Sequence, residues 1–560
     1  MSATTGAPTA ATPRTTRPAS PTTAGALTLT RFFVRRDRVR IPVWALSVSV
    51  MFLYATVALG AVYPTASDRQ VRANLVSSPA AIMMTGPGYG TDDYTLGAMV
   101  ANEFTLWVVA AVAIMNVLLV VRHTRAEEET GRAELVRAGV VGRRAPGLAA
   151  FCTAVVANLA VGVLSLVMLL VGGASVEDSG ITVPDTVALC LGVALTGLVF
   201  AAVASVTSQV TEHARAASGA AFAVLGLAYL LRAIGDVQAE HGSWVSWLSP
   251  LAWTQQTRPY VDLRWWPLAL PVVLVVVLLL VAVRLTARRD LGAGLVPVRP
   301  GRADARPGLR SPFALAWRQQ RASVVAWGSG IAVLGLATGT FANQMDDITA
   351  MVEDNALAAE IFGGPDQVLD AFDAVMVLFL AVGVGAWALA SFLRAHGEET
   401  SGRAEPLLVA PVSRSRWLGA HLAVTGIGTL VLLAGAGLSL GLGEVAVGRE
   451  VGALGEILVA TLLYLPAVAV LVGVSALAFG VLGRLVQLGW ALLAYAFVVG
   501  MFGPLLDLPS WAVHVSPFAS VPTLADADAA WWPLAVLVVV AVALLAGSFV
   551  GFRRRDLATG

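Results

Sequence analysis

The sequence EEETGRAE at residues 127–134 returns as EETSGRAE at residues 398–405, and the separation of the two copies is 402 − 131 = 271 residues. The same separation relates VGR at residues 141–143 to VSR at residues 412–414. Each copy is a charged, helix-forming segment between two long apolar runs. The repeat therefore predicts a duplicated membrane unit, with a first handle (residues 127–134) in one half and a second handle (residues 398–405) in the other.

The composition is typical of a protein embedded in a bilayer. Of the 560 residues 57% are hydrophobic and 13% are charged, whereas about 25% of a soluble globular protein is charged. A net charge of +1 and the absence of a basic patch interleaved with aromatic residues exclude nucleic acid as a partner. The sequence has no lysine, so it lacks the phosphate-binding motif GxxxxGK[ST]. The chain is therefore not expected to be an ATPase, and a partner, an ion gradient or a membrane potential must energise it.

Neither cysteine indicates a disulfide or a metal site. Cys152 and Cys190 both lie in apolar runs, where a cysteine behaves as a small hydrophobic residue. Residues 1–24 are rich in Ala, Thr and Pro, which predicts a disordered tail and not a signal peptide.

Twelve apolar runs approach the length of about 20 residues that a membrane-crossing helix needs, six in each half. They lie near Ile41–Val62, Met99–Val121, Leu148–Val171, Val183–Val206, Ala216–Leu231, Trp265–Val283, Val324–Phe341, Ala374–Leu393, Leu418–Leu442, Ile457–Leu482, Leu485–Leu505 and Trp531–Phe549. We expect an all-α polytopic membrane protein with 12 transmembrane helices.

The arginines predict the orientation of the chain. Five arginines lie within residues 31–40, ahead of the first run, and Arg553, Arg554 and Arg555 follow the last run. Positively charged residues stay on the cytosolic side, so both termini are predicted to be cytosolic in a plasma-membrane protein. The loop of residues 346–370 has seven acidic residues and no arginine, and it is predicted to face outward. Both handles are then cytosolic.

The repeat extends to the end of each half. WWPL at residues 265–268 recurs at 531–534, and RRDL at residues 288–291 recurs at 554–557, in both cases 266 residues later. The halves therefore run in the same direction, as parallel repeats about an axis along the membrane normal. The predicted domains are the disordered tail 1–24, the first six-span half 25–286, a cytosolic linker 287–307 and the second six-span half 308–560.

Features at the ends of the spans carry further predictions. Leu27–Arg40 and Phe313–Arg321 hold both arginine and aromatic residues ahead of the first span of each half, which favours segments that lie in the interface plane. Glu103 and Asp373 lie near the outer ends of the second and eighth spans, and we expect both to be surface-facing caps and not gating residues.

The spacing within the handles predicts ion pairs. Glu128 stands four residues before Arg132, and Glu399 stands four before Arg403. At this spacing a glutamate and a cation pair on a helix surface and contribute roughly 0.2–0.5 kcal/mol. A solvated helix stabilised by its own pairs is therefore one interpretation. Two copies at equal separation favour a second interpretation, in which the two handles are docking sites for a partner with two-fold symmetry.

The pattern EExxGRxE, with a following arginine, stands between the second and third spans of a six-span unit and resembles the permeases of ABC-2-type exporters. The resemblance is to the actinobacterial polyketide-antibiotic (tetronasin-type) exporter family, in which two six-span halves are fused, and it covers nearly the whole chain from about Leu27. It implies a subunit of multidrug efflux and antibiotic resistance that exports hydrophobic or amphipathic compounds, including drugs and lipids. It also implies two copies of a P-loop ATP-binding subunit as partners. ATP and Mg²⁺ would bind to those subunits, with no cofactor on this chain.

In that family the segment after the second span is the coupling helix, which docks on the ATP-binding subunits. The resemblance implies coupling roles for the matching handle residues, which are Glu127, Glu128, Gly131, Arg132, Glu134, Glu398, Glu399, Gly402, Arg403 and Glu405. The second handle is followed by Pro406, where the first half has Leu135, and this difference predicts a kink.

The resemblance also implies a substrate path between the halves, lined by the second and fifth spans of each. This places Asn116, Tyr229, Trp387 and Tyr495 near the path. Residues of these types also pack helices together, and that alternative stays open.

A major-facilitator-type secondary transporter is the strongest rival, since it too has twelve spans in two parallel repeats. An ion-coupled carrier usually needs ionisable groups inside its helices. The apolar runs of this chain are nearly free of charge, with His421 as the main titratable exception. The acidic handles also suit a docking partner better than a self-contained carrier.

A membrane glycosyltransferase is the second rival. Asp92 and Asp93 are adjacent carboxylates that could hold a divalent metal on a sugar phosphate. They follow a Gly-Tyr-Gly sequence that is typical of an ordinary turn. Metal-dependent sugar transfer that Asp92→Asn abolishes would favour this enzyme.

Overall fold

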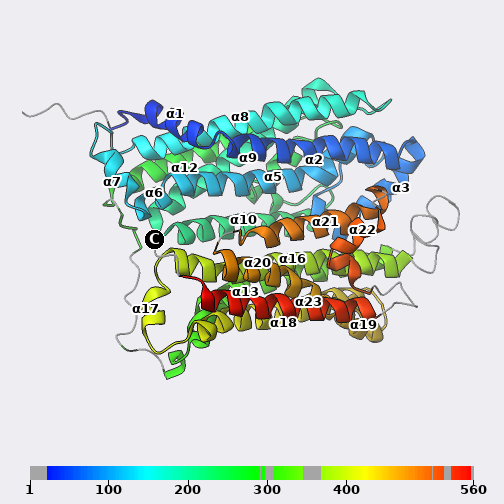
Figure 1. Cartoon of the computed structure of the whole chain (residues 1–560). Coiled ribbons are helices and arrows are strands. Elements are labelled where there is room, and N and C mark those ends of the chain that lie inside the picture. Colours follow the sequence, from blue (N-terminus) through cyan, green and yellow to red (C-terminus); the bar gives the residue numbers. More distant parts are fainter. Residues whose placement is uncertain are drawn as a thin grey trace, which may run out of the picture. The chain divides into compact units, whose positions relative to one another are not determined.

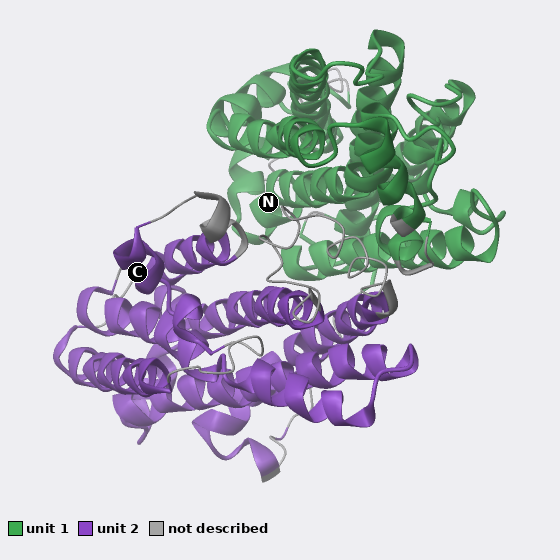
Figure 2. Ribbon diagram, turned by 90° about the vertical axis from the view of Figure 1, so that its right-hand side faces the viewer, with its two compact units in different colours: residues 1–300 green, residues 301–560 purple. Residues whose placement is uncertain are grey.

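A computed structural model describes residues 22–77, 79–290, 292–296, 304, 307–344, 368–483, 485–506, 509–522 and 531–556. The chain divides into two compact units, residues 1–300 and 301–560 (Figure 2). The described parts are helical and contain no strand. Most of the predicted tail and outward loop lies outside the described residues, as do residues 291, 297–303, 305 and 306 of the predicted linker.

Unit 1 is built on six long helices with shorter ones between them (Figure 1). Its elements are α1 (Ala26–Arg36), α2 (Arg40–Val62), α3 (Ala66–Val76), α4 (Pro79–Thr85), α5 (Leu96–His123), α6 (Arg125–Glu129), α7 (Arg132–Arg137), α8 (Ala145–Ala174), α9 (Val183–Val210), α10 (Ala214–Gln238), η1 (Ser246–Leu248), α11 (Ala252–Gln255), η2 (Trp266–Leu268) and α12 (Ala269–Ala287).

The core of unit 1 lies around α5 and α9. The most apolar stretch of α9 is 78% buried, against 17% for α12, which leaves α12 at the periphery. Small polar side chains join the helices. Asn116 of α5 and Asn158 of α8 exchange amide hydrogen bonds of 3.1 and 2.7 Å, and Ser49 of α2 lies 2.9 Å from Ser165 of α8. Such bonds link helices where hydrocarbon offers no other partner.

Unit 2 has a similar set of long helices. Its elements are η3 (Pro307–Leu309), α13 (Pro312–Gly339), η4 (Thr340–Gln344), α16 (Val368–Thr400), α17 (Glu405–Val409), α18 (Arg414–Ala446), α19 (Val451–Leu462), α20 (Leu465–Leu482), α21 (Leu488–Leu506), α22 (Ser510–Val515), η6 (Phe518–Ser520) and α23 (Trp532–Arg554).

The helices of the two units have matching neighbours. In unit 1, α2 packs on α8, α5 on α9 and α10, and α9 on α12. In unit 2, α13 packs on α18, α16 on α20 and α21, and α20 on α23. The first long helix of each unit therefore packs on the third, the second on the fourth and fifth, and the fourth on the sixth.

Eleven helices within the described residues are long and apolar enough to cross a membrane, so the chain is a multi-pass membrane protein. The run predicted at Leu485–Leu505 is α21, of which Leu488–Gly500 counts as a shorter apolar helix. The run at Ile457–Leu482 is divided between α19 and α20. Pro466 lies in the first turn of α20, where its missing N–H favours a new helix start.

The prediction of equivalent interface segments ahead of the two halves is wrong for the second half. In unit 1, α1 is a separate helix that ends before Asp37, and α2 begins at Arg40. In unit 2, residues 313–321 are the first turns of α13, which continues without a break to Gly339. Ser311 caps the α13 N-terminus by accepting a hydrogen bond of 3.2 Å from the Ala314 amide, so the helix begins ahead of the aromatic stretch.

Glycines allow α13 and α18 to approach closely. A Cβ atom on Gly339 would lie 2.2 Å from the Leu440 carbonyl oxygen, and one on Gly443 would lie 2.5 Å from the Leu336 carbonyl oxygen. Gly335, one turn before Gly339, faces Ser439 in the same way. This spacing of small residues brings helix backbones into contact in membranes.

We expect Gly339→Leu to destabilise unit 2 by about 1–3 kcal/mol, because the added side chain must separate α13 from α18. Gly330→Leu is the matched control, since Gly330 lies on the same helix and a Cβ there meets nothing within 4 Å. The measurement is the thermal unfolding midpoint of each full-length variant in detergent. Equal midpoints for the two variants would contradict the close contact.

Candidate functional site

The first handle is a helix–glycine–helix segment at one end of unit 1. The backbone leaves α5 at Thr124, forms α6, and turns at Gly131, whose φ of +73° lies in the left-handed region, before α7 begins at Arg132. Gly402 in the second handle also has φ +73° and lies between α16 and α17. A residue with a side chain is strained at this φ, so glycine is required where the two helices of each handle change direction.

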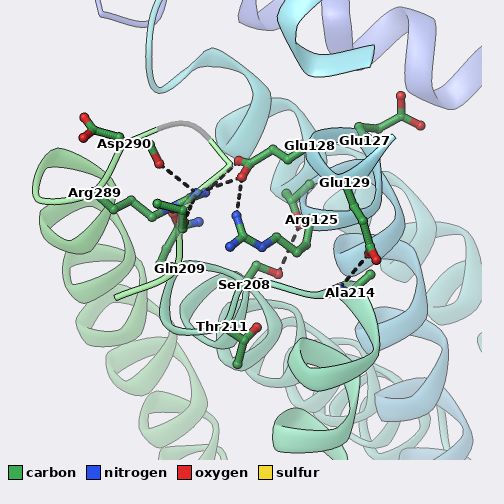
Figure 3. A network of polar contacts seen from close by, with 12 residues as sticks. Arg125, Glu127, Glu128, Glu129, Ser208, Gln209, Thr211, Ala214, Arg289 and Asp290 are labelled. Atoms are coloured by element: carbon green, nitrogen blue, oxygen red, sulfur yellow. Dashed lines mark hydrogen bonds and ion pairs between the residues drawn. The ribbon is translucent and has the colours of Figure 1, made fainter. Parts of the chain in front are cut away.

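Arginines anchor the first handle to the end of unit 1, and one of them, Arg125 of α6, binds Glu128 over 2.5 Å from within the same segment. Arg289 follows α12 and forms a two-pronged ion pair with Glu128, with distances of 2.6 and 2.7 Å (Figure 3). Its Nε atom donates to the Gln209 side chain at the end of α9 over 2.6 Å. The Arg289 and Glu128 side chains are only 7% and 11% exposed. The pair therefore holds the ends of three elements in a place of low solvent access.

The second handle is anchored in the same way. Arg555 follows α23 and forms a two-pronged pair with Glu399, with distances of 2.7 and 2.6 Å. Its Nε atom donates to the Phe479 carbonyl near the end of α20 over 3.0 Å. The guanidinium also lies over the rings of Phe479 and Phe552. We call the Glu128–Arg289 and Glu399–Arg555 pairs the first and second clamps.

A second arginine binds each clamp from the start of the third long helix. Arg143 donates to the backbone carbonyl of Arg289 over 2.5 Å. Arg414 donates to the backbone carbonyl of Arg555 over 2.6 Å. Arg143 and Arg414 are the arginines that follow the two handles at the 271-residue separation. Each clamp thus joins the ends of the second, third, fourth and sixth long helices of its unit.

The predicted i,i+4 pairs within the handles are wrong. Arg132 lies 3.9 Å from Glu127 and not against Glu128, and Arg403 lies 3.1 Å from Glu398 and not against Glu399. The glycine turn is the reason, because it ends the helix that carries the glutamates: Arg132 starts the next helix and Arg403 lies in the turn ahead of α17. The matching pairs again differ by 271 residues.

Pro406 does not kink the second handle. It lies in the first turn of α17, which begins at Glu405. The first amide groups of a helix have no intrahelical partner, so a proline there removes no hydrogen bond.

The first handle also binds α1. Arg36 forms an ion pair with Glu127 over 2.5 Å, and Asp37 binds both Arg122 and the His123 Nε2 atom at the end of α5. The Phe33 ring stacks on His123 with ring centres 4.3 Å apart. The amphipathic helix α1 is thereby fixed to the base of the first handle.

The coupling residues inferred from the resemblance fall into two groups. Glu127, Glu128 and Glu398 are half-buried and Glu399 is buried, and all four bind arginines of their own unit. The exposed group carries charge outward, and it consists of Arg132, Glu134, Arg403 and Glu405. Only this second group is available on the surface of its unit.

The family model of the multidrug efflux system permease Rv1217c, C-terminal domain, matches residues 30–285 and 309–553. The chain belongs to this family. It is 37% identical over 544 residues to the multidrug efflux system permease protein Rv1217c of Mycobacterium tuberculosis (strain ATCC 25618 / H37Rv), with 95% of each chain covered. The match includes both handles, whereas the clamp arginines lie just beyond it, Arg289 four residues after the first matched segment and Arg555 two residues after the second.

The relative that matches this chain is named a permease. The resemblance implies that four residues lie near a substrate path, and the structure shows the surroundings of each. Asn116 and Trp387 are buried, and Trp387 donates to the Ser323 hydroxyl over 3.2 Å. Tyr229 donates to the Met83 carbonyl over 3.1 Å, and Tyr495 donates to the Ala512 carbonyl over 2.6 Å. Each of the four therefore has a hydrogen-bond partner in its own unit, and their role in a path stays a prediction.

Glu103 and Asp373 are buried, which corrects the prediction of surface-facing caps. Glu103 binds Arg72 of α3 over 2.7 Å, and Asp373 binds Arg449 over 2.8 Å. Arg449 also binds the buried Glu444 over 2.7 Å. Burial works to lower the pKa of Arg449, but its hydrogen bonds to Glu444 and Asp373 and their charges outweigh burial and raise it. Each of these acids is thus paired with an arginine from a connecting segment, and Asp373 and Glu444 share one.

Asp92 and Asp93, proposed above as alternative metal ligands, lie in the turn between α4 and α5. In the parts of the chain that the structure describes, no group of three or more His, Cys, Asp or Glu side chains is placed to hold a metal ion.

Arg289 and Arg555 are functional-site residues that the handle motif alone does not predict. The signal that could have identified them is the repeated RRDL at residues 288–291 and 554–557, because a motif that recurs with the handles must serve both halves. Its second arginine is the one that forms the clamp in each unit.

We expect Arg289→Gln to loosen the first handle, because Glu128 then loses its two-pronged partner and keeps only Arg125, 2.5 Å away on the same handle segment. The cost is below the about 3–5 kcal/mol for a buried charge left without any partner, since Arg125 remains. Limited trypsin digestion of the full-length protein should cut faster after Arg132 and Arg137. Arg288→Gln is the matched control, since Arg288 is the exposed neighbour of Arg289. Equal cleavage rates in the two variants would show that the clamp does not hold the handle.

Proposed function

We propose that this chain is the permease of an ATP-driven exporter that moves hydrophobic or amphipathic compounds, such as antibiotics and other drugs, out of the cell. Membership of the Rv1217c family supports transport, since the relative is named a multidrug efflux system permease. The observation that carries the ATP-driven part is the pair of anchored handles, each fixed by its clamp to the ends of four long helices. The absence of lysine, and with it of the GxxxxGK[ST] motif, supports the proposal that other subunits hydrolyse ATP.

We propose twelve transmembrane helices in two parallel six-helix repeats. The matching helix neighbours, the matching clamps and the left-handed glycines support this arrangement. With α21 as the twelfth span, the arginines that flank the first and last spans support the proposal that both termini of this plasma-membrane protein are cytosolic. Both handles then face the cytosol.

The proposed partners are two copies of a P-loop ATP-binding subunit, one for each handle. Arg132 and Arg403 have 60% and 57% of their side chains exposed, so they can meet acidic groups of a partner. A partner docked on a handle would transmit force to the clamp. The clamp would pass this force to the ends of the second, third, fourth and sixth spans. ATP-driven closure of the partners would then shift each unit between two states, as a population shift requires.

The finer proposal is that the chain is of the tetronasin-type group, which carries polyketide antibiotics. The sequence motif in the handles and the fusion of two halves in one chain support it. The apolar spans favour a hydrophobic or amphipathic cargo over a charged one.

The first experiment is purification of the full-length protein from its native membrane in mild detergent, with quantification of co-purifying proteins. We expect two P-loop ATPase subunits per chain. If the chain purifies alone and still moves a lipophilic dye in vesicles that lack ATP, a secondary transporter replaces the exporter.

The second experiment reverses the exposed handle charges. Arg132→Glu with Arg403→Glu should lower ATP-dependent transport by roughly tenfold or more, since like charges at an interface cost several kcal/mol, while the partner ATPase stays active. The matched control is Arg288→Glu with Arg554→Glu, which reverses one exposed arginine per unit outside the handles. Normal transport in the handle variant would remove Arg132 and Arg403 from the mechanism.

A further inference from the structure

Unit 1 contains a cavity of about 440 Å³ directly beneath the first handle. It lies between α1, the handle, the start of α8 and the end of α12. This volume falls in the range of about 300–1,000 Å³ that is usual for small-molecule sites. The clamp forms part of its wall, because Glu128 and Arg289 both line it.

One end of the cavity has an excess of positive charge. Arg137, Arg143 and Arg144 line it, and within the described residues none of them forms an ion pair with a carboxylate. The two acids that line the cavity are already bound, Glu127 by Arg36 and Glu128 by Arg289.

Arg137 shows what the cavity lacks. Its Nε atom is buried and has no hydrogen-bond partner. Burial lowers the pKa of the Arg137 guanidinium; Glu128 offsets part of this effect, and Arg143 and Arg289 add to it. A buried donor among like charges is stabilised by an anion.

The other end of the cavity is apolar and faces the membrane. Val276 and Leu280 of α12 line it and are 52% and 55% exposed, and Leu148 of α8 and Phe32 of α1 are also exposed. These helices are on the surface of the unit, since only 17% of the most apolar stretch of α12 is buried. An occupant therefore reaches the cavity from the bilayer.

The same place in unit 2 is closed. There the space between the start of α13, the second handle and the start of α18 is only about 10 Å³. The indole of Trp417 fills it and stacks on Phe552, with ring centres 5.6 Å apart. At the 271-residue and 266-residue separations, these residues correspond to Pro146 and Thr286, which line the open cavity.

The positive charge is also confined to unit 1. The 271-residue separation relates Arg137 to Leu408 and Arg144 to Ser415, so unit 2 lacks both arginines and keeps only the one that corresponds to Arg143. The large volume and the uncompensated charge therefore occur together in one unit and are both lost in the other.

We propose that this cavity binds one anionic phospholipid, whose phosphate group contacts Arg137, Arg143 and Arg144 and whose acyl chains lie along α8 and α12. Basic pockets between transmembrane helices are a known mode of anionic headgroup recognition. The lipid would come from the leaflet at the handle end, which is the cytosolic leaflet in the orientation proposed above. Because Val136 and Arg137 of α7 line the same cavity, the bound lipid would support the first handle from below.

The test measures lipid binding by the full-length protein in detergent, without ATP or partner subunits, so its result is independent of the exporter proposal. The probes are dioleoylphosphatidylglycerol, dioleoylphosphatidylcholine and inorganic phosphate. Native mass spectrometry counts bound lipid, and the thermal unfolding midpoint reports stabilisation. We expect one phosphatidylglycerol per chain and a raised midpoint, with little effect of phosphatidylcholine.

Two variants give unit 1 the residues of unit 2. Arg137→Leu with Arg144→Ser should weaken phosphatidylglycerol binding about 25-fold, at about fivefold for each arginine near a headgroup. Pro146→Trp should abolish binding by filling the cavity, and its position in the first turn of α8 tolerates the loss of proline. Arg416→Leu, an exposed arginine at the start of α18, is the control and should bind as the natural protein does.

Three results would overturn the proposal. Equal binding of phosphatidylcholine would show that the anionic charge is not recognised. A midpoint raised equally by inorganic phosphate would indicate a free-anion site and not a lipid site. Unchanged phosphatidylglycerol binding in the double arginine variant would place the lipid elsewhere, and this variant stays informative even if Pro146→Trp does not fold.

Discussion

Each unit depends on one arginine that follows its last long helix and reaches a glutamate at the end of its second. A helix end leaves carbonyl groups without intrahelical partners, and charged segments next to a bilayer need counter-charges of their own. Arg289 and Arg555 each bind a carboxylate and accept, through the backbone carbonyl, from an arginine at the start of the third long helix. At the end of the fourth long helix Arg289 donates to the Gln209 side chain and Arg555 to the Phe479 carbonyl. The clamps fix the handles in position relative to the helices, which is the geometric condition for a handle to move the long helices of its unit.

Energetically, the clamps matter more for order than for net stability. A buried ion pair loses much of its hydration, so an apolar replacement of both partners could be equally stable. Removing only one member of the ion pair is costly, however. The clamp therefore favours the one arrangement of helix ends in which both members are paired. The same logic applies at the opposite end of unit 2, where Arg449 binds both Asp373 and Glu444. Since α16 and α18 each contribute one of these acids, the arginine also fixes the contact between two helices.

Much of the fold could be predicted from the sequence, because apolar runs of sufficient length must form helices in lipid. The handles were visible as well, since charged residues between apolar runs cannot be buried in the bilayer. The ion pairs were not, because the i,i+4 rule considers one helix at a time and the glycine turn breaks that helix. Glu128 binds an arginine 161 residues further along the chain, and only the tertiary structure brings the two together. The repeated RRDL motif includes the clamp arginine of each half, but a motif alone does not indicate which residues its side chains contact.

Repetition in the sequence also concealed differences in packing. Asn116 and Trp387 correspond at the 271-residue separation, yet one forms an amide pair with Asn158 and the other packs over Gly428. Two halves with one ancestral pattern have therefore filled their interiors with different side chains. Local replacements of this kind are compatible with the same helix neighbours, because the long apolar faces determine which helices meet.

The second handle lies over the closely packed indole of Trp417, whereas the first handle lies over an open cavity. A handle supported by close-packed aromatic rings deforms little under an applied force. A handle above a cavity deforms first and transmits only the remaining force to the helices. The two handles would then differ in mechanical compliance, even though their clamps are the same. Equal forces on the two handles would displace their units by unequal amounts. A single permease chain would then have one stiff handle and one compliant handle.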